Sequence, residues 1–416
     1  IRPRDWSSDV CSSDLPARFP ADHPEYDKIN RSFSAGEHVI STQVHYLGVD
    51  NRILDDVQPF WACEIYQEGK SIPVVWRCTP LTGYEPRVRR INPQLGWIEW
   101  CDTRQIPLHW REIAFDDSSW TEPVSVKPRI GQPEPLSIDS VRCFSHLVQP
   151  IAEGPLAEIF GYERDDIPAR FYLRDLECKT LPAQGVWRRY DVGRVRLMRP
   201  RFVLDVPAGT VIEFAYNETL SQGRVSPYIN LSAGPSCNLD HYVARGGEQE
   251  FFPLMPRGGR FIELHVFADP AQVKWIREEF IERGYYDSPE GSFHCGDVLL
   301  EQIWMTGIET FRGCCEDAVI DNPTRERGEW TGDVSTVAMD IASVGYGDIR
   351  LCRRALEHSA SCAREDGLVA GLCPGGEAYI PSYAAQWISG CIHYWQLTGD
   401  RALLEELFPY AERNMT

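Results

Sequence analysis

The sequence predicts two antiparallel β-sandwich domains followed by the first part of an α/α toroid. A change in hydrophobic periodicity carries this prediction: short stretches of alternating apolar residues run to about residue 288, and the period then lengthens to 3.6 residues. With 416 residues and 43% hydrophobic content, the chain is long enough for several domains with cores of their own. We therefore divide it into segments 16–165, 166–288 and 289–416.

Residues 1–15 stand apart from this scheme. The stretch from Asp5 to Leu15 resembles the in-frame translation of a common sequencing-library adapter, and it has neither apolar period. We expect residues 1–15 to be non-native and the true N-terminus to be missing, so a secretion signal cannot be judged. Once Cys11 is set aside, an odd number of cysteines remains from the 14 in the chain, which favours a reducing compartment such as the cytoplasm.

Composition excludes several classes of partner. A net charge of -19 repels phosphate backbones and anionic membrane surfaces, so we expect no nucleic acid and no membrane partner, whereas neutral carbohydrate is indifferent to this charge. No apolar run approaches the roughly 18 residues of a membrane span. The cysteines form no Cys-x-x-Cys and no Cys/His cluster at metal spacing, and nothing implies a cofactor. The oligomeric state stays open.

Segment 16–165 reads as short strands. Residues 37–46 are rich in β-branched and aromatic side chains, and strand-like pieces follow at 60–66 and 72–78. Residues 115–120 place an Asp-Asp-Ser-Ser turn between Phe and Trp. These features resemble a β-sandwich of the galactose-binding type. Such a resemblance in fold does not by itself imply sugar binding.

Segment 166–288 predicts a second antiparallel sandwich. Residues 202–206 lead through a Pro-Ala-Gly-Thr turn into 211–216, where Ile212, Phe214 and Tyr216 share one face, and residues 260–266 alternate again. His241 and His265 are lone strand histidines, which we expect to be hydrogen-bonded neighbours and not ligands.

Segment 289–416 predicts five helices, each marked by an apolar stripe of period 3.6. Loops such as 366–380 are too long for simple helical hairpins, which favours a toroid over a bundle. The stripes consist of Leu300, Ile303, Trp304, Ile308 and Phe311; of Val334, Val337, Ala338 and Ile341; of Ile349, Cys352 and Leu356; of Tyr383, Trp387, Cys391, Tyr394 and Trp395; and of Leu403, Leu404 and Leu407.

The richest chemistry lies at residues 321–333, where Pro323 and Gly328 predict a loop before a helix. Arg325 can fork onto a carboxylate or vicinal hydroxyls, and Trp330 offers a flat face for a sugar ring. Glu326 is the best candidate for a general acid, because Asp321 and Asp333 could raise its pKa by repulsion.

Two uncertainties remain within this motif. Arg325 and Arg327 would oppose a raised pKa at Glu326 if they pointed at it, and the sequence leaves their direction open. The purely structural alternative is that Asp321 caps a helix, Arg325 and Glu326 form a surface ion pair, and Trp330 fills a helix interface. A calcium site is disfavoured, because the acids lack the one-three-five spacing of a calcium loop.

The motif Asp321-x-Pro-x-Arg325-Glu326-x-x-x-Trp330-Thr-Gly-Asp333 resembles the signature of the bacterial α-L-rhamnosidases of glycoside hydrolase family 78, whose usual form is Asp-Cys-Pro-x-Arg-Glu-Arg followed by Trp-Thr-Gly-Asp. Residues 187–193, 207–210, 217–220 and 240–243 are similar to the β-domain that precedes the family's (α/α)6 catalytic toroid. The departures are Asn322 in place of the cysteine and a Gly328-Glu329 pair, whose Glu329 we expect to add negative charge beside the pocket.

The resemblance implies roles for five residues. Glu326 would be the catalytic general acid, and Asp321, Arg325, Trp330 and Asp333 would bind the terminal rhamnose of a rhamnose-containing oligosaccharide or glycoside. The family inverts configuration, so a second carboxylate about 6.5–9.5 Å away must activate water. In the family this base is a Glu from the later half of the toroid, beyond Thr416. We therefore expect an inactive fragment.

Two alternatives stay open. One is an α/α-toroid hydrolase for another deoxy sugar or a uronic sugar. The other is a non-catalytic carbohydrate-binding protein that uses its sandwiches.

Overall fold

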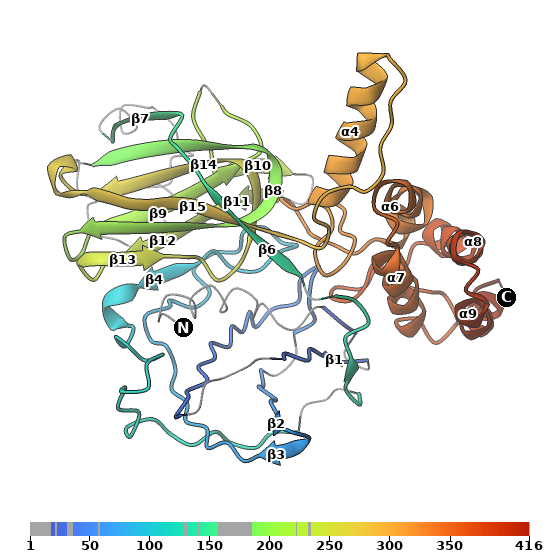
Figure 1. Ribbon diagram of the computed structural model, residues 1–416, viewed down its shortest axis with the longest axis horizontal. Helices are drawn as coiled ribbons and strands as arrows, with labels where there is room; N and C mark the ends of the chain where they lie inside the picture. The colour runs from blue at the N-terminus through green and yellow to red at the C-terminus, as the bar shows by residue number, and fades with distance from the viewer. Residues whose placement is uncertain are drawn as a thin grey trace.

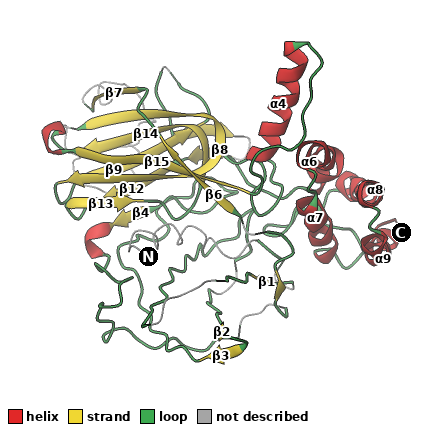
Figure 2. Cartoon of the chain, viewed as in Figure 1, coloured by secondary structure: helices red, strands yellow, loops and turns green. Residues whose placement is uncertain are grey.

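A large β-region followed by a group of helices forms the molecule (Figures 1 and 2). The computed structural model describes residues 18–20, 23–30, 36–56, 59–127, 131–139, 141–156, 185–221, 223–231 and 234–415. The predicted artefact at 1–15 and the boundary at 165/166 lie outside these residues, so both stay predictions. In the described part of the chain, no helix is long and apolar enough to cross a membrane. No group of three or more His, Cys, Asp or Glu side chains in that part could hold a metal ion.

One long strand, β8 (Val186–Val206), organises the nine-stranded sheet. Its first half pairs antiparallel with β7 and β14, and its second half pairs with β13 and β15. Beyond β14 the order continues through β9, β12 and β4, and beyond β15 comes β6. The other strands of this sheet are β4 (Trp100–Asp102), β6 (Arg142–Leu147), β7 (Ala152–Pro155), β9 (Val211–Asn217), β12 (Leu239–Val243), β13 (Gly247–Phe251), β14 (Arg257–Phe267) and β15 (Lys274–Gly284).

An apolar core holds the two halves of this sheet together. Ile212, Phe214 and Tyr216 face it from β9, as the alternation predicts. The Phe214 ring lies 5.6 Å from that of Phe202 in the second half of β8. The opposite face of the same sheet is also covered, since Ala215 packs in a separate cluster with Ile91 and other N-terminal residues. Burial of both faces makes the sheet a rigid support for what packs beside it.

Residues before 157 depart from the expected strand pattern. Residues 37–46 form no ladder, and Ile40, Val44 and Tyr46 are exposed. That strand prediction is wrong, because extended β-branched residues need a partner strand and none pairs with them among the described residues. The pieces at 60–66 and 72–78 contribute to a small hairpin of β2 (Ile65–Gln67) and β3 (Lys70–Ile72), and Cys78 makes an isolated bridge with Thr121.

The other short elements of this region are β1 (Glu25–Tyr26), which pairs with β5 (Glu134–Pro135), and the 3-10 turn η2 (Thr103–Gln105). β4, β6 and β7 join the main sheet. The galactose-binding-type sandwich of segment 16–165 therefore stays a prediction.

His241 and His265 are hydrogen-bonded neighbours within the main sheet. His241 lies 3.4 Å from a Glu213 oxygen and stacks on Trp100, while His265 lies 3.0 Å from a Glu263 oxygen. Both imidazoles are buried.

The short η3 turn (Pro270–Gln272) connects β14 to β15.

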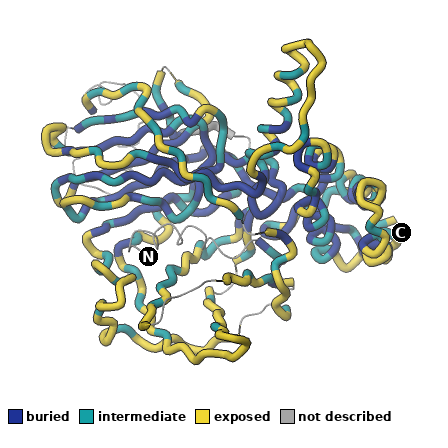
Figure 3. The backbone as a smooth tube through the Cα atoms, in the orientation of Figure 1, coloured by how far each residue is buried: buried dark blue, intermediate teal, exposed yellow. Residues whose placement is uncertain are grey.

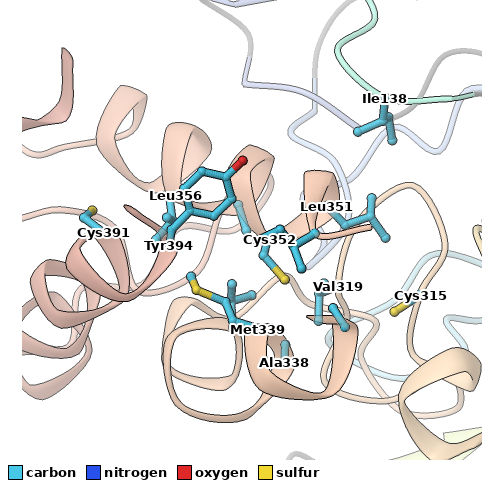
Figure 4. Packing of buried hydrophobic residues seen from close by; sticks show 14 of the residues in the cluster. Ile138, Cys315, Val319, Ala338, Met339, Leu351, Cys352, Leu356, Cys391 and Tyr394 are labelled. Atoms are coloured by element: carbon cyan, nitrogen blue, oxygen red, sulfur yellow. The ribbon is translucent and has the colours of Figure 1, made fainter. Parts of the chain in front are cut away.

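Helices follow the strands, as the change of period predicts. They are α4 (Val298–Gly313), the single turn α5 (Thr331–Asp333), the π-helical turn η4 (Val334–Ala338), α6 (Met339–Tyr346), α7 (Arg350–Ser361), α8 (Pro381–Thr398) and α9 (Arg401–Met415). Asp297 caps α4 by accepting the N–H of Leu299, and Gly347 and Gly399 end α6 and α8 in left-handed conformation. Met339, Leu356 and Tyr394 belong to the core that joins α6, α7 and α8 (Figure 4).

Helix α4 stands away from this core for much of its length (Figures 1 and 3). Ile308 and Phe311 near its C-terminal end are buried, but Leu300 and Ile303 of the same predicted stripe are exposed. Val298 and Leu299 are exposed as well, at 68% and 64%. Only the C-terminal part of the predicted apolar stripe is therefore buried by other described residues, and its N-terminal part is exposed.

Candidate active site

A closed loop between α4 and α5 carries the sequence motif. The N–H of Asp321 donates to the carbonyl of Gly328 (2.9 Å), and the N–H of Gly328 donates back to Asp321 Oδ1 (3.0 Å). Inside the loop, Asn322 Oδ1 accepts the N–H groups of Thr324 and Arg325, at 3.2 and 2.6 Å. Asn322, where the family has a cysteine, thus braces the loop by local side-chain to backbone bonds.

Glu326 is buried at the centre of a ring of donors. Its Oε1 accepts the indole N–H of Trp330 and a guanidinium N–H of Arg325, both at 3.2 Å. Its Oε2 accepts the side-chain N–H of Gln94, and Arg52 Nε lies 3.9 Å from the same oxygen. With a side-chain exposure of only 7%, this carboxyl is held in one orientation.

The two arginines of the motif point in opposite directions. Arg325 Nη2 lies 3.2 Å from Asp321 Oδ2 as well as from Glu326, so it bridges the two carboxyl groups. Arg327 has φ 54° and directs its buried guanidinium onto Glu316, at 2.6 and 2.8 Å. The direction left open by the sequence is therefore settled for both side chains, and only Arg325 contacts Glu326.

Carboxylate repulsion acts on the neighbours of Glu326. Burial raises the pKa of Asp321 to about 7, and its hydrogen bond with Glu326 and the Glu326 charge add to this rise. Burial also raises the pKa of Asp333, again with a contribution from the Glu326 charge. Asp333 lies at the end of α5. The acids at 321, 326 and 333 thus interact as one electrostatic group.

Trp330 and Tyr383 form an aromatic corner beside the acids. Their rings meet edge to face, with centroids 5.9 Å apart. Gly332 permits this contact, because a Cβ there would lie 2.6 Å from the Tyr383 ring. Burial and the charges of Asp333, Asp321 and Glu326 raise the pKa of Tyr383. The sequence placed Tyr383 on an apolar stripe, but it is only partly buried and belongs to the site.

Three residues of the N-terminal region complete the site. Asn92 Nδ2 donates to the carbonyl of Arg325 (2.6 Å), and Gln94 reaches Glu326. Arg52 donates to the carbonyl of Gly376 (2.9 Å), and its guanidinium lies over Trp330, 5.4 Å from the ring centroid. Sequence reasoning missed all three, because nothing in their local pattern signals a partner more than 230 positions away.

One expectation about the pocket is wrong. Glu329 does not add charge beside it, because the side chain turns inward and is 1% exposed. His358 Nδ1 lies 2.9 Å from Glu329 Oε2 and compensates for its burial.

A buried carboxyl beside an arginine, a second acid and an indole, held on a loop before a helix, is an arrangement of the kind that glycosidase sites use. Residues 288–416 match the bacterial α-L-rhamnosidase six-hairpin glycosidase domain. This part of the chain is therefore similar to the catalytic domain of the bacterial α-L-rhamnosidases. No curated protein gives a significant match to the sequence.

Solved structures share the fold at low sequence identity. The family 78 rhamnosidase of Bacillus sp. GL1 matches with a TM-score of 0.74 and 17% identity, over 88% of this chain and 59% of that one. The Streptomyces avermitilis α-L-rhamnosidase in complex with L-rhamnose matches with a TM-score of 0.57 and 18% identity, over 76% and 28%. The Klebsiella oxytoca rhamnosidase with rhamnose bound gives 0.52 and 19%, over 67% and 56%. The chain spans somewhat more than half the length of the Bacillus enzyme.

Proposed function

We propose that this chain carries the acid half of an inverting α-L-rhamnosidase site. The observation that carries the proposal is the arrangement around Glu326: a buried carboxyl that shares Arg325 with Asp321 and accepts the indole N–H of Trp330. Asp321, Arg325, Trp330 and Asp333 would hold a terminal rhamnose. Rhamnose is the ligand in the related Streptomyces and Klebsiella structures, which supports this choice of sugar.

The proposed chemistry uses Glu326 as a Brønsted acid. Its proton passes to the glycosidic oxygen as the bond from that oxygen to the anomeric carbon breaks, and the aglycone leaves as an alcohol. Water attacks the anomeric carbon from the opposite face and loses its proton to a second carboxylate. The product is rhamnose of inverted configuration. The cluster of Asp321 and Glu326 can retain a proton near neutral pH, because burial and repulsion raise the pKa of Asp321 to about 7.

We further propose that the water-activating carboxylate belongs to helices outside these 416 residues, which would complete an (α/α)6 toroid behind two β-sandwiches. The exposed apolar residues of α4 support this part, because Val298, Leu299 and Ile303 offer a face of the kind that a neighbouring helix covers. Rhamnose binding by the 416-residue chain without catalysis is the expected behaviour.

Two measurements test the proposal. The 416-residue chain should release no rhamnose from an aryl α-L-rhamnoside, and measurable release would refute the missing base. In a protein that contains the complete six-hairpin domain, Glu326→Gln should lower turnover by about 10²–10⁴-fold while rhamnose affinity survives. Full activity of that variant would show that the acid is misassigned. A panel of other aryl deoxyglycosides and aryl uronides serves as the control for sugar identity.

A further inference from the structure

Gln94 is held rigidly beside the proposed acid. Its backbone N–H donates to Asn92 Oδ1 (2.7 Å), and its carbonyl accepts the N–H of Arg52 (2.8 Å). The turn that carries it is closed by the bond from Ile91 N–H to the Gly96 carbonyl (2.8 Å). From this frame the Gln94 side chain reaches across 232 positions of sequence and donates Nε2–H to Glu326 Oε2.

The other end of the same amide has no partner. Gln94 Oε1 is buried and accepts no hydrogen bond from any described residue. A buried acceptor without a donor costs free energy, so such an atom in a site calls for an explanation. The oxygen and nitrogen of a glutamine amide exchange places by a half-turn of the terminal torsion. Gln94 Oε1 can therefore take the position from which Nε2 now faces Glu326.

The two oxygens of Glu326 have different hydrogen-bond partners. Oε1 already accepts N–H groups from Trp330 and Arg325, and neither donor can become an acceptor. Arg52, 3.9 Å from Oε2, also interacts favourably only with the ionised form. Oε1 therefore faces two donors, and a proton on Oε2 would require an acceptor there. Among the groups that contact Oε2, only the Gln94 amide can supply one.

We propose that Gln94 is a positioning residue for the general acid, holding Glu326 Oε2 in both protonation states. It donates Nε2–H to the carboxylate and, after a half-turn, accepts the acid proton on Oε1. On bond cleavage the Oε2–H turns from Gln94 Oε1 to the glycosidic oxygen and its proton passes to that oxygen, and the amide turns back to donate to the carboxylate that remains. This inference rests on the proposed function, because it assumes that Glu326 is the acid.

Infrared spectroscopy tests the contact in the 416-residue chain without requiring catalysis. The C=O stretch of protonated Glu326 is identified by its disappearance in Glu326→Gln. In Gln94→Met, which keeps the length of the side chain but neither donates nor accepts, this band should move to higher frequency because the acid O–H has lost its acceptor. The matched control is Gln67→Met on the exposed strand β2, which should leave the band in place. An unmoved band in Gln94→Met overturns the inference.

Leaving-group dependence provides the kinetic test, in a protein with the complete six-hairpin domain. An alcohol with a high pKa needs protonation to leave, whereas 2,4-dinitrophenolate does not. Gln94→Met should therefore lower turnover up to about 100-fold on an alkyl rhamnoside, and much less on the dinitrophenyl rhamnoside. Equal losses on both substrates overturn the inference and point to a purely structural role.

One further variant, compared with Glu326→Gln, separates the possible failures. Gln94→Asn retains an amide that is too short to reach Glu326, so it should behave as Gln94→Met does, and unchanged rhamnose affinity in either variant shows that the pocket is assembled. If Glu326→Gln itself shows no leaving-group dependence, the proposed function fails. If Glu326→Gln shows that dependence and Gln94→Met and Gln94→Asn do not, only the role of Gln94 fails.

Discussion

Arg327 turns its guanidinium away from its neighbour Glu326 and binds both carboxylate oxygens of Glu316, at 2.6 and 2.8 Å. Arg283 and the buried Arg18 converge on the same carboxylate. Arg18 also donates to the carbonyl of Arg327 (2.7 Å). Glu316 therefore anchors the loop at 321–328 through Arg327 and keeps that guanidinium away from the proposed acid.

Glu316→Gln should destabilise the protein strongly. The substitution leaves Arg327, Arg283 and Arg18 buried around a neutral group, and breaking a buried ion pair in this way costs about 3–5 kcal/mol. Urea unfolding followed by tryptophan fluorescence measures the loss, with the exposed Glu406→Gln on α9 as the matched control. A change as small as that of the control would mean that the arginines find water or other acceptors.

The pH dependence of stability should carry the signature of Asp321. Its pKa rises from the ordinary 3.8 to about 7, so between about pH 4 and pH 7 the folded state binds a proton that the unfolded state releases. The free energy of unfolding therefore falls as pH increases through this window. Asp321→Asn should remove that fall, so the variant gains stability relative to the parent at pH 8.

Chemical unfolding at several pH values checks this prediction, with the exposed Asp287→Asn as the control. Parallel pH profiles for the parent and Asp321→Asn would show that the proton of the cluster resides elsewhere.

Gly332→Ala should perturb the aromatic corner. The added Cβ would lie 2.6 Å from the Tyr383 ring, so the ring or the α5 turn must move, at a cost of about 1–3 kcal/mol. The double variant Gly332→Ala with Tyr383→Ala removes the clash and should show a coupling between the two sites in thermal unfolding. Gly307→Ala on α4, where a Cβ meets nothing within 4 Å, is the matched control. Additive effects would contradict the predicted contact.

Rhamnose binding should depend on the face of Trp330. Trp330→Ala removes the platform, and we expect the dissociation constant to rise about tenfold or more. Trp330→Phe keeps an aromatic face but loses the N–H bond to Glu326 Oε1, so it should bind rhamnose better than the alanine variant does. Calorimetry on the 416-residue chain measures both constants. Equal affinity for the parent and Trp330→Ala would place the sugar elsewhere.

The local contacts of the motif follow from its spacing in the sequence, whereas the roles given to its residues stay predictions. Asp321, Arg325, Glu326 and Trp330 are brought into contact as their spacing on one loop suggested, and Asp333 follows one helical turn later. Periodicity also identified the change from strands to helices. Such predictions succeed because neighbouring residues share one backbone, and their possible contacts are limited.

Contacts between distant segments were beyond this reasoning. Gln94 and Arg52 have no motif around them, and Tyr383 follows the same spacing as the core residues of its helix. Residues 37–46 have the composition of a strand but form no ladder, because composition does not specify a partner. The burial of Glu329 depends on its contact with His358, a partner 29 positions away that no local pattern indicates.

The contacts that Arg52, Asn92 and Gln94 make with the loop at 321–333 have a consequence for synthesis of the protein. A ribosome makes these residues more than 230 positions before the loop they hold. The β-region can fold as it emerges, but the N-terminal turn must wait, with its donors exposed, until the loop has been translated. The pocket is thus expected to form late in co-translational folding.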